Sequence, residues 1–131
     1  MRILIAEDDL ISRKIILKIL SQYGDCDVTV DGMEALDAYL LAIKENNPYD
    51  LICLDIMMPK IDGVRVLKAI RTIEQQKEIS MMNRAKIIML TALADKEYVA
   101  KSFEIGCEAY ATKPIDTAKL VEVLQKLDLI K

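Results

Sequence analysis

Short runs of apolar residues alternate along the chain with longer segments in which apolar residues recur at helical spacing. This alternation is typical of repeated strand–helix units, which form a parallel sheet with helices on its faces. The apolar runs predict five strands, at residues 3–6, 26–30, 51–54, 87–90 and 108–111. We therefore expect an α/β fold of the (βα)5 type.

The first two predicted helices follow the first two strands. The first is expected to bury one apolar face, made of Ile11, Ile15, Leu17, Ile19 and Leu20. Gly24 follows this helix and is expected to end it. Asp31 and Glu34 have the spacing of a capping pair and predict the start of the second helix, which should end before the Asn-Asn-Pro sequence at 46–48.

Three further helices are predicted in the second half of the chain. The third begins after Asp62, and residues 74–86 are expected to form a helix extension followed by a loop. The fourth covers residues 96–104 and ends at Gly106. The inner face of the fifth is expected to contain Leu120, Val121, Val123, Leu124 and Leu127.

Length, composition and charge narrow the class of protein. A chain of 131 residues with 53% hydrophobic content is sufficient for one ordinary core, so residues 1–131 are expected to form one domain. The 18 basic residues are interspersed among 21 acidic ones, which argues against direct nucleic-acid binding. No apolar segment resembles a signal peptide or a membrane span, so we expect a cytoplasmic protein without membrane attachment.

The cysteines indicate neither a disulfide framework nor a metal-binding knuckle. Cys26, Cys53 and Cys107 are odd in number, widely spaced and embedded in apolar or mixed segments. We expect reduced and partly buried thiols.

Asp55 is the most informative residue of the sequence. It directly follows the four apolar residues 51–54, which predict a strand that is buried on both faces. Pro59 and Gly63 then favour a turn. An aspartate here lies at the carboxyl end of a strand, where open α/β sheets bind their ligands.

Other polar residues also directly follow predicted strands. Glu7 and Asp8 follow the first, Thr91 the fourth and Lys113 the fifth. In a flavodoxin-like, doubly wound three-layer sandwich with strand order 2-1-3-4-5, the first and third strands are neighbours, so Glu7, Asp8 and Asp55 would meet. Three like charges require a cation, and carboxylates with carbonyls and waters suit Mg²⁺. Thr91 and Lys113 could then hold phosphoryl oxygens, which predicts phosphoryl transfer onto Asp55.

Four motifs at four strand ends resemble one known family, the receiver domain of two-component response regulators. The resemblance spans nearly the whole chain, and its order and spacing are highly specific. The matching motifs are Glu7-Asp8, the loop DIMMPKIDG at 55–63, Thr91-Ala92 and Lys113-Pro114.

The resemblance implies a phosphoacceptor. Asp55 would take a phosphoryl group from a phosphohistidine on a sensor histidine kinase or a histidine phosphotransfer protein. Asp8, Asp55 and the backbone carbonyl of Met57 would bind Mg²⁺ directly, and Glu7 would act mainly through water. Transfer would depend on positioning and charge neutralisation.

The resemblance also implies a switch. Thr91 would bond the phosphoryl group and move its loop, and Lys113 would pair with another phosphoryl oxygen. Tyr110 matches the aromatic residue that turns inward after the threonine has moved. The switched surface would comprise the fourth helix, the fifth strand and the fifth helix. The bond from Lys113 to Pro114 is expected to be cis.

Some neighbouring residues have simpler interpretations. Asp9 and Asp62 are expected to cap helices, and Met58 to pack internally, whereas the Met57 side chain should point toward the mouth of the site. Met57 and Leu93 lie two residues after Asp55 and Thr91, and neither can position an attacking water. We therefore expect slow intrinsic loss of the phosphoryl group.

The chain contains no histidine, so it can be neither the histidine kinase nor a histidine phosphotransfer carrier. Because few residues follow the fifth predicted helix, we expect a stand-alone receiver without an output domain. It would signal to a target or pass the phosphoryl group onward, as a monomer or a phosphorylation-dependent dimer. Beyond its own phosphorylation and dephosphorylation, no enzymatic activity is expected.

Three alternatives remain. A degenerate receiver could bind partners constitutively without phosphorylation. A phosphatase with an aspartyl nucleophile commonly has a second acid two residues later, where this chain has Met57. A flavin-binding relative would need a phosphate-binding loop after the first strand, where Glu7 and Asp8 would repel the ligand.

Overall fold

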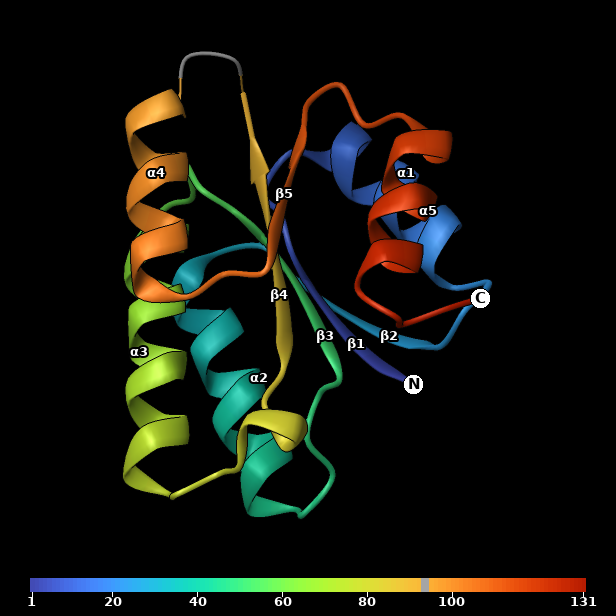
Figure 1. Ribbon diagram of the computed structural model, residues 1–131. Coiled ribbons are helices and arrows are strands. Elements are labelled where there is room, and N and C mark those ends of the chain that lie inside the picture. Colours follow the sequence, from blue (N-terminus) through green and yellow to red (C-terminus); the bar gives the residue numbers. More distant parts are fainter. Residues whose placement is uncertain (93–94) are drawn as a thin grey trace.

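The computed structural model describes residues 1–92 and 95–131. In these residues, five parallel strands form one sheet in the order β2-β1-β3-β4-β5, which confirms the predicted fold (Figure 1). The strands are β1 (Arg2–Ala6), β2 (Asp25–Thr29), β3 (Leu51–Asp55), β4 (Lys86–Thr91) and β5 (Ala109–Thr112). Each differs from its predicted range by one residue at one or both ends, because the ends depend on hydrogen bonds to neighbouring strands.

Helices cover both faces of the sheet. Helices α1 and α5 lie on one face, and α2, α3 and α4 lie on the other (Figure 1). Their bounds are α1 (Leu10–Leu20), α2 (Gly32–Lys44), α3 (Gly63–Gln76), α4 (Lys96–Ile105) and α5 (Thr117–Lys126). Among the described residues, no helix is long and apolar enough to span a membrane.

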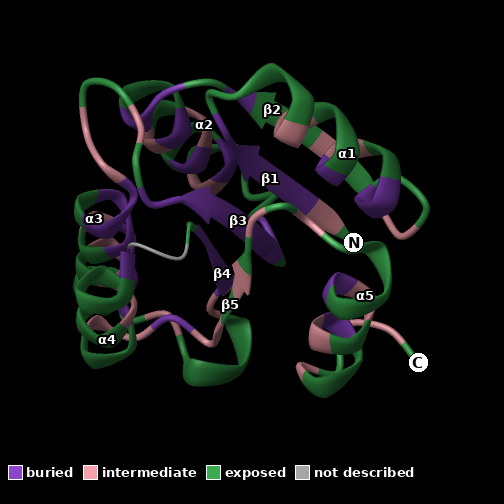
Figure 2. Cartoon of the chain, turned by 90° about the horizontal axis from the view of Figure 1, so that it is seen from above, coloured by how far each residue is buried: buried purple, intermediate pink, exposed green. Residues whose placement is uncertain are grey.

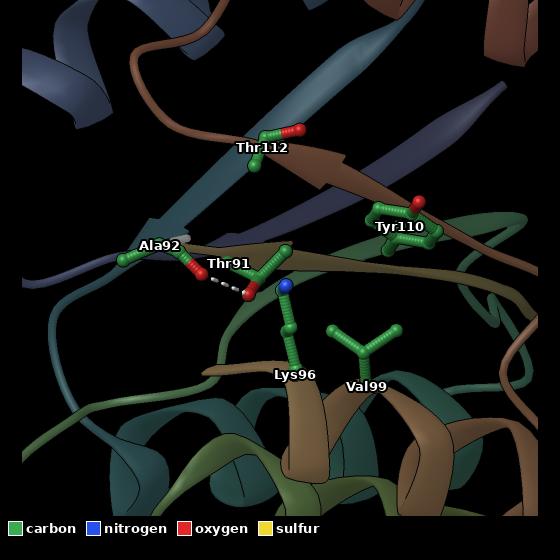
Figure 3. A pocket seen from close by; sticks show the side chains of 6 residues that line it. All are labelled: Thr91, Ala92, Lys96, Val99, Tyr110 and Thr112. Atoms are coloured by element: carbon green, nitrogen blue, oxygen red, sulfur yellow. Dashed lines mark hydrogen bonds between the residues drawn. The ribbon is translucent and has the colours of Figure 1, made fainter. Parts of the chain in front are cut away.

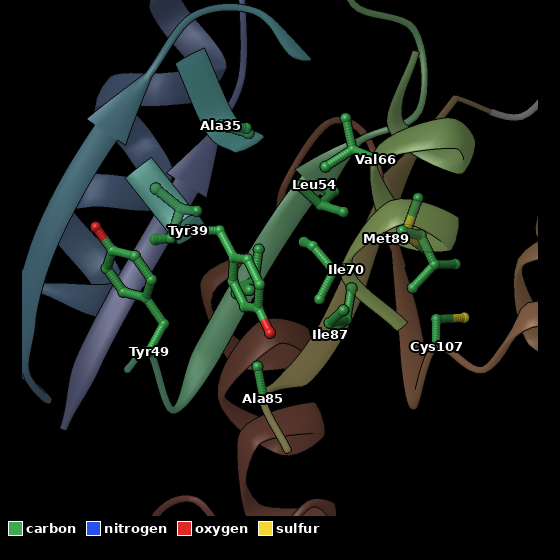
Figure 4. Packing of buried hydrophobic residues seen from close by; sticks show 14 of the residues in the cluster. Ala35, Tyr39, Tyr49, Leu54, Val66, Ile70, Ala85, Ile87, Met89 and Cys107 are labelled. Atoms are coloured by element: carbon green, nitrogen blue, oxygen red, sulfur yellow. The ribbon is translucent and has the colours of Figure 1, made fainter. Parts of the chain in front are cut away.

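Strand β3 lies at the centre of the core, and all five of its residues are buried (Figure 2). Successive side chains point to opposite faces of a strand. Ile52 and Leu54 accordingly pack in the cluster beneath α2 and α3, where Figure 4 shows Leu54 among its neighbours. Leu51 and Cys53 pack in the cluster beneath α1 and α5. This double burial explains the uninterrupted apolar run.

Four of the helices are directly preceded by an aspartate whose side chain caps the helix. Each accepts a hydrogen bond from the backbone N–H three residues later, which satisfies one free donor of the first turn. These caps are Asp9, Asp31, Asp62 and Asp116. The predicted caps at Asp9, Asp31 and Asp62 are therefore confirmed, and Glu34 completes its pair by accepting a hydrogen bond from the backbone N–H of Val30.

The predicted inner face of α1 is partly wrong. Ile11 is 70% exposed and Ile15 is 37% exposed, whereas Ile16, Ile19 and Leu20 are buried. Three apolar residues in a row at 15–17 leave the orientation of the helix ambiguous in the sequence. The structure selects the stripe at positions i, i+3 and i+4 that begins at Ile16.

The segment 74–86 begins as a helix extension, as predicted, and then contains the short 3₁₀ helix η1 (Met81–Asn83). Glu74, the first residue of the segment 74–86, is buried. The Glu74 carboxylate accepts hydrogen bonds from Arg71 at 2.6 Å and from the Ala85 N–H at 2.9 Å. Arg71 also pairs with Glu108 at 2.8 Å, so this network joins α3 to the beginnings of β4 and β5.

Candidate functional site

Asp55 is the last residue of β3, at the carboxyl edge of the sheet. The chain turns sharply after it, and the Gly63 N–H donates a hydrogen bond to the Ile56 carbonyl at 2.8 Å. A Cβ atom at Gly63 would lie only 2.2 Å from the Asp55 carbonyl oxygen. Glycine therefore allows the loop to return close to Asp55, which fixes the position of the aspartate.

Three carboxylates meet at this edge. Glu7, Asp8 and Asp55 each place one oxygen within 4.8 Å of the others. Glu7 and Asp55 are buried, whereas Asp8 is exposed. The predicted clustering follows from the adjacency of β1 and β3 in the sheet. The site is thus strongly acidic, with one side open to solvent.

Lys113 reaches this cluster from the end of β5. Its Nζ lies 2.5 Å from Glu7 Oε1 and 3.1 Å from Asp55 Oδ2. The backbone N–H of Lys113 donates a hydrogen bond to the Thr91 carbonyl at 2.7 Å. The peptide bond from Lys113 to Pro114 is cis, as predicted. One ammonium group therefore contacts two of the three carboxylates.

Charge and burial shift the pKa values of this pair. Burial, followed by hydrogen bonding and repulsion from Glu7, raises the pKa of Asp55 to about 8, although Lys113 opposes the shift. Burial lowers the pKa of Lys113, but the contacts with Glu7 and Asp55 outweigh burial and raise it above the ordinary value. Asp55 therefore needs additional positive charge nearby to ionise fully at neutral pH.

The donor set fits Mg²⁺. Glu7 Oε2 is buried and has no hydrogen-bond partner among residues 1–92 and 95–131. Such an orphaned oxygen is costly unless a cation or a water binds it. Together with Asp8 and Asp55 it offers the hard oxygen ligands that Mg²⁺ prefers, with an open side for waters.

The residues after Asp55 form one wall of a groove. Met57 is 55% exposed and lines the groove with Asp8, and its N–H lies 3.3 Å from Asp55 Oδ1. Met58 packs against the buried cluster, as predicted. Apolar surface therefore borders the acidic site.

Thr91 ends β4 and is buried. Its hydroxyl donates to the Ala92 carbonyl at 2.9 Å (Figure 3). The same hydroxyl lies 3.4 Å from Asp95 Oδ2. The Ala92 N–H also donates to Asp95 Oδ2, at 2.9 Å. Sequence analysis did not select Asp95, and Leu93 lies outside the described residues.

Tyr110 on β5 is 47% exposed and lines a shallow pocket with Thr91, Lys96 and Val99 (Figure 3). Its ring makes an edge-to-face contact with Phe103 of α4, with centroids 6.0 Å apart. Such aromatic pairs contribute about 0.5–1.5 kcal/mol beyond burial. Phe103, which sequence analysis did not select, therefore stabilises the outward position of Tyr110.

Comparisons with known proteins converge on one family. A family model described as the response regulator receiver domain matches residues 3–125. The chain is 32% identical to the chemotaxis protein CheY of Treponema pallidum, over 92% of this chain and 78% of that protein. It is 36% identical to hybrid signal transduction histidine kinase I of Dictyostelium discoideum, covering 94% of this chain but only 7% of the kinase.

Solved structures show the same likeness. A response regulator described as putative, from Chloroflexus aurantiacus, has 28% identity and a TM-score of 0.76, with 96% of this chain and 95% of that chain covered. A second match is the co-crystal structure of the Saccharomyces cerevisiae histidine phosphotransfer protein Ypd1 with the receiver domain of its downstream response regulator Ssk1. It has 25% identity and a TM-score of 0.79, and covers 99% of this chain and 92% of the matched chain.

Proposed function

Because this chain belongs to the response regulator receiver family, we propose that Asp55 accepts a phosphoryl group from a phosphohistidine on a partner protein. One observation carries the proposal. The carboxylates of Glu7, Asp8 and Asp55 converge with the Lys113 ammonium at a single sheet edge. This arrangement provides a nucleophile, oxygen ligands for Mg²⁺ and a cation for phosphoryl oxygens.

The transfer step needs only the phosphohistidine donor and a proton from solvent. An Asp55 carboxylate oxygen forms the new bond to phosphorus, and the phosphorus–nitrogen bond to the histidine breaks. The bonding electron pair returns to the imidazole nitrogen, which takes a proton from solvent. Bound Mg²⁺ supplies positive charge that favours the ionised carboxylate and neutralises the phosphoryl oxygens. Asp55 needs this charge because its pKa is otherwise raised to about 8.

After transfer, the side chains around Asp55 would hold the product. Lys113 would pair with one phosphoryl oxygen, and the Thr91 hydroxyl would donate to another. Tyr110 would then turn inward from its contact with Phe103. The changed surface of α4, β5 and α5 would signal to a target or support onward relay.

Apolar residues beside the acidic site suit a protein donor. Leu10 and Ile11, at the start of α1 just after Asp8, are 53% and 70% exposed, and Met57 is 55% exposed. Apolar surface of this kind is typical of protein contacts. The Ypd1–Ssk1 complex supports a phosphotransfer protein or a histidine kinase as the kind of partner.

We propose that the phosphorylated state is long-lived, since Met57 offers no polar group to position an attacking water. The chain would catalyse only its own phosphorylation and dephosphorylation. We further propose that residues 1–131 act as one receiver domain in the cytoplasm, as a monomer or a phosphorylation-dependent dimer.

Transfer of radiolabelled phosphate from a phosphorylated histidine phosphotransfer protein tests this function. The chain should gain label only with Mg²⁺, and Asp55→Asn should gain none. Asp62→Asn is a matched control, because it makes the same substitution in the same loop. Asp62 caps α3, and asparagine can form the same cap. Equal labelling of the native chain and Asp55→Asn would refute the assignment of Asp55. If neither the native chain nor the variants gained label, the result would favour a degenerate receiver that binds partners constitutively without phosphorylation.

A further inference from the structure

Asp95 directly precedes α4, but its side chain does not cap that helix. Its carboxylate turns back instead, accepts the Ala92 N–H at 2.9 Å and lies 3.4 Å from the Thr91 hydroxyl. Asp95 is only 7% exposed, so solvent competes little for these contacts. A buried anion thus accepts the Ala92 N–H and lies beside the Thr91 hydroxyl, which donates to the Ala92 carbonyl at 2.9 Å.

The aspartates that directly precede the other four helices behave differently. Asp9, Asp31, Asp62 and Asp116 each accept a backbone N–H from the first turn of their own helix. Within the described part of the chain, the Asp95 side chain accepts no N–H from the first turn of α4. It contacts Ala92 and Thr91 instead. Asp95 is thus tied to the end of β4 by two bonds, since its N–H donates to the Ala92 carbonyl at 3.1 Å and its carboxylate accepts the Ala92 N–H at 2.9 Å.

These donors lie next to the proposed phosphorylation site. Asp55 pairs in register with Leu90, and Thr91 is the next residue along β4. A phosphoryl group on Asp55 would be a strong anionic acceptor for donors at this edge. The single hydroxyl proton of Thr91 cannot serve that acceptor and its present acceptors at the same time.

We propose that Asp95 is a positioning residue that holds the Ala92 N–H and, through the longer contact, attracts the Thr91 hydroxyl in the unphosphorylated protein, and that it competes for these donors with the phosphoryl group. The inference rests on the proposed function. Formation of the phosphoryl group would require these donors to leave Asp95, and the two anions would repel each other across the same donors. Asp95 therefore favours the unswitched state by direct competition.

Binding of beryllofluoride, a stable phosphoryl analogue, tests this competition at saturating Mg²⁺. Asp95→Ala should bind it about fivefold more tightly than the native chain, because a competing anionic acceptor is removed. Asp95→Asn removes only the charge, and its affinity should lie between the two. Asp116→Ala is the matched control, since Asp116 precedes another ten-residue helix and its side chain accepts the Lys119 N–H of that helix. Its affinity should equal that of the native chain.

Two further measurements separate positioning from a structural role. Titration with Mg²⁺ alone should give the same affinity in all variants, because Asp95 is not among the clustered carboxylates. In a Thr91→Val background the gain from Asp95→Ala should shrink, since one of the released donors is missing. Asp95→Asn keeps an oxygen acceptor, so it tests the proposal even where the alanine variant folds poorly.

The possible failures can be told apart. Unchanged or weaker beryllofluoride binding by both Asp95 variants, with normal binding by the native chain, would overturn the role of Asp95 and leave the phosphoacceptor function intact. An equal gain in Asp116→Ala would also overturn it, because the effect would then be a general loss of helix stability. Absence of binding by the native chain would overturn the proposed function and the role of Asp95 together.

Discussion

Replacing Asp55 with asparagine is expected to stabilise the protein against unfolding when Mg²⁺ is absent. The carboxylates of Glu7, Asp8 and Asp55 lie within 4.8 Å of one another, so each charged pair costs at least about 3.5 kcal/mol at an effective dielectric constant of about 20. The attraction between Lys113 and Asp55, 3.1 Å apart, stabilises the folded state by about 5 kcal/mol on the same scale. The two repulsions on Asp55 exceed this attraction, and burial adds to the cost.

The effect depends on pH in a defined direction. The pKa of Asp55 rises from an ordinary value of 3.8 to about 8 in the folded protein. Between these values the folded state holds a proton that the unfolded chain has released, so the native protein loses stability as pH rises through this window. Asparagine cannot ionise, but it weakens the contact with Lys113. We therefore expect the stability of Asp55→Asn relative to the native chain to rise by up to about 4 kcal/mol between pH 5 and pH 8, with the variant the more stable form at pH 8.

Urea unfolding followed by circular dichroism in EDTA, at pH 5 and pH 8, measures this gain. Added Mg²⁺ should reverse the order of stability, because on the proposed function it would bind the native carboxylates and stabilise the folded state by mass action. Asp62→Asn is the control and should show no gain that grows with pH. If Asp55→Asn were less stable than the native chain at pH 8 in EDTA, the electrostatic account of the site would be wrong.

Three more predictions concern the neighbouring structure. Gly63→Ala should lower the free energy of unfolding by about 2–4 kcal/mol, because its Cβ would meet the Asp55 carbonyl oxygen at 2.2 Å; an unchanged urea midpoint would contradict this. Arg71→Ala should cost about 3–5 kcal/mol by leaving buried Glu74 unpaired, and less in a Glu74→Ala background; additive losses would argue against the pair. Lys113→Ala should tighten Mg²⁺ binding about tenfold in calorimetry, since the ammonium competes for the same carboxylates; weaker binding would exclude this competition.

The sheet and the position of the candidate site could be predicted because they depend on local patterns and on a general rule of topology. The run at 51–54 indicates a doubly buried strand, and parallel strands place their carboxyl ends at one edge. That rule was sufficient to bring Glu7, Asp8 and Asp55 together. Their chemical roles stay predictions until they are measured.

Contacts between distant segments could not be predicted in the same way. Arg71 and Glu74 have the sequence pattern of an exposed helical pair, but Glu74 is buried because Ala85 and Glu108 complete the network from later segments. An aspartate before a helix favours a cap, and nothing in the sequence reveals that the Asp95 side chain turns back toward β4. Such orientations arise only when the elements pack.

Intact-mass analysis after incubation with acetyl phosphate detects phosphorylation of Asp55 without a partner protein. We expect one phosphoryl adduct that requires Mg²⁺, is absent from Asp55→Asn and is retained in Asp62→Asn, with fragmentation placing it on Asp55. An adduct of equal yield in Asp55→Asn, or none on the native chain with Mg²⁺ binding confirmed, would show that Asp55 is not a phosphoacceptor.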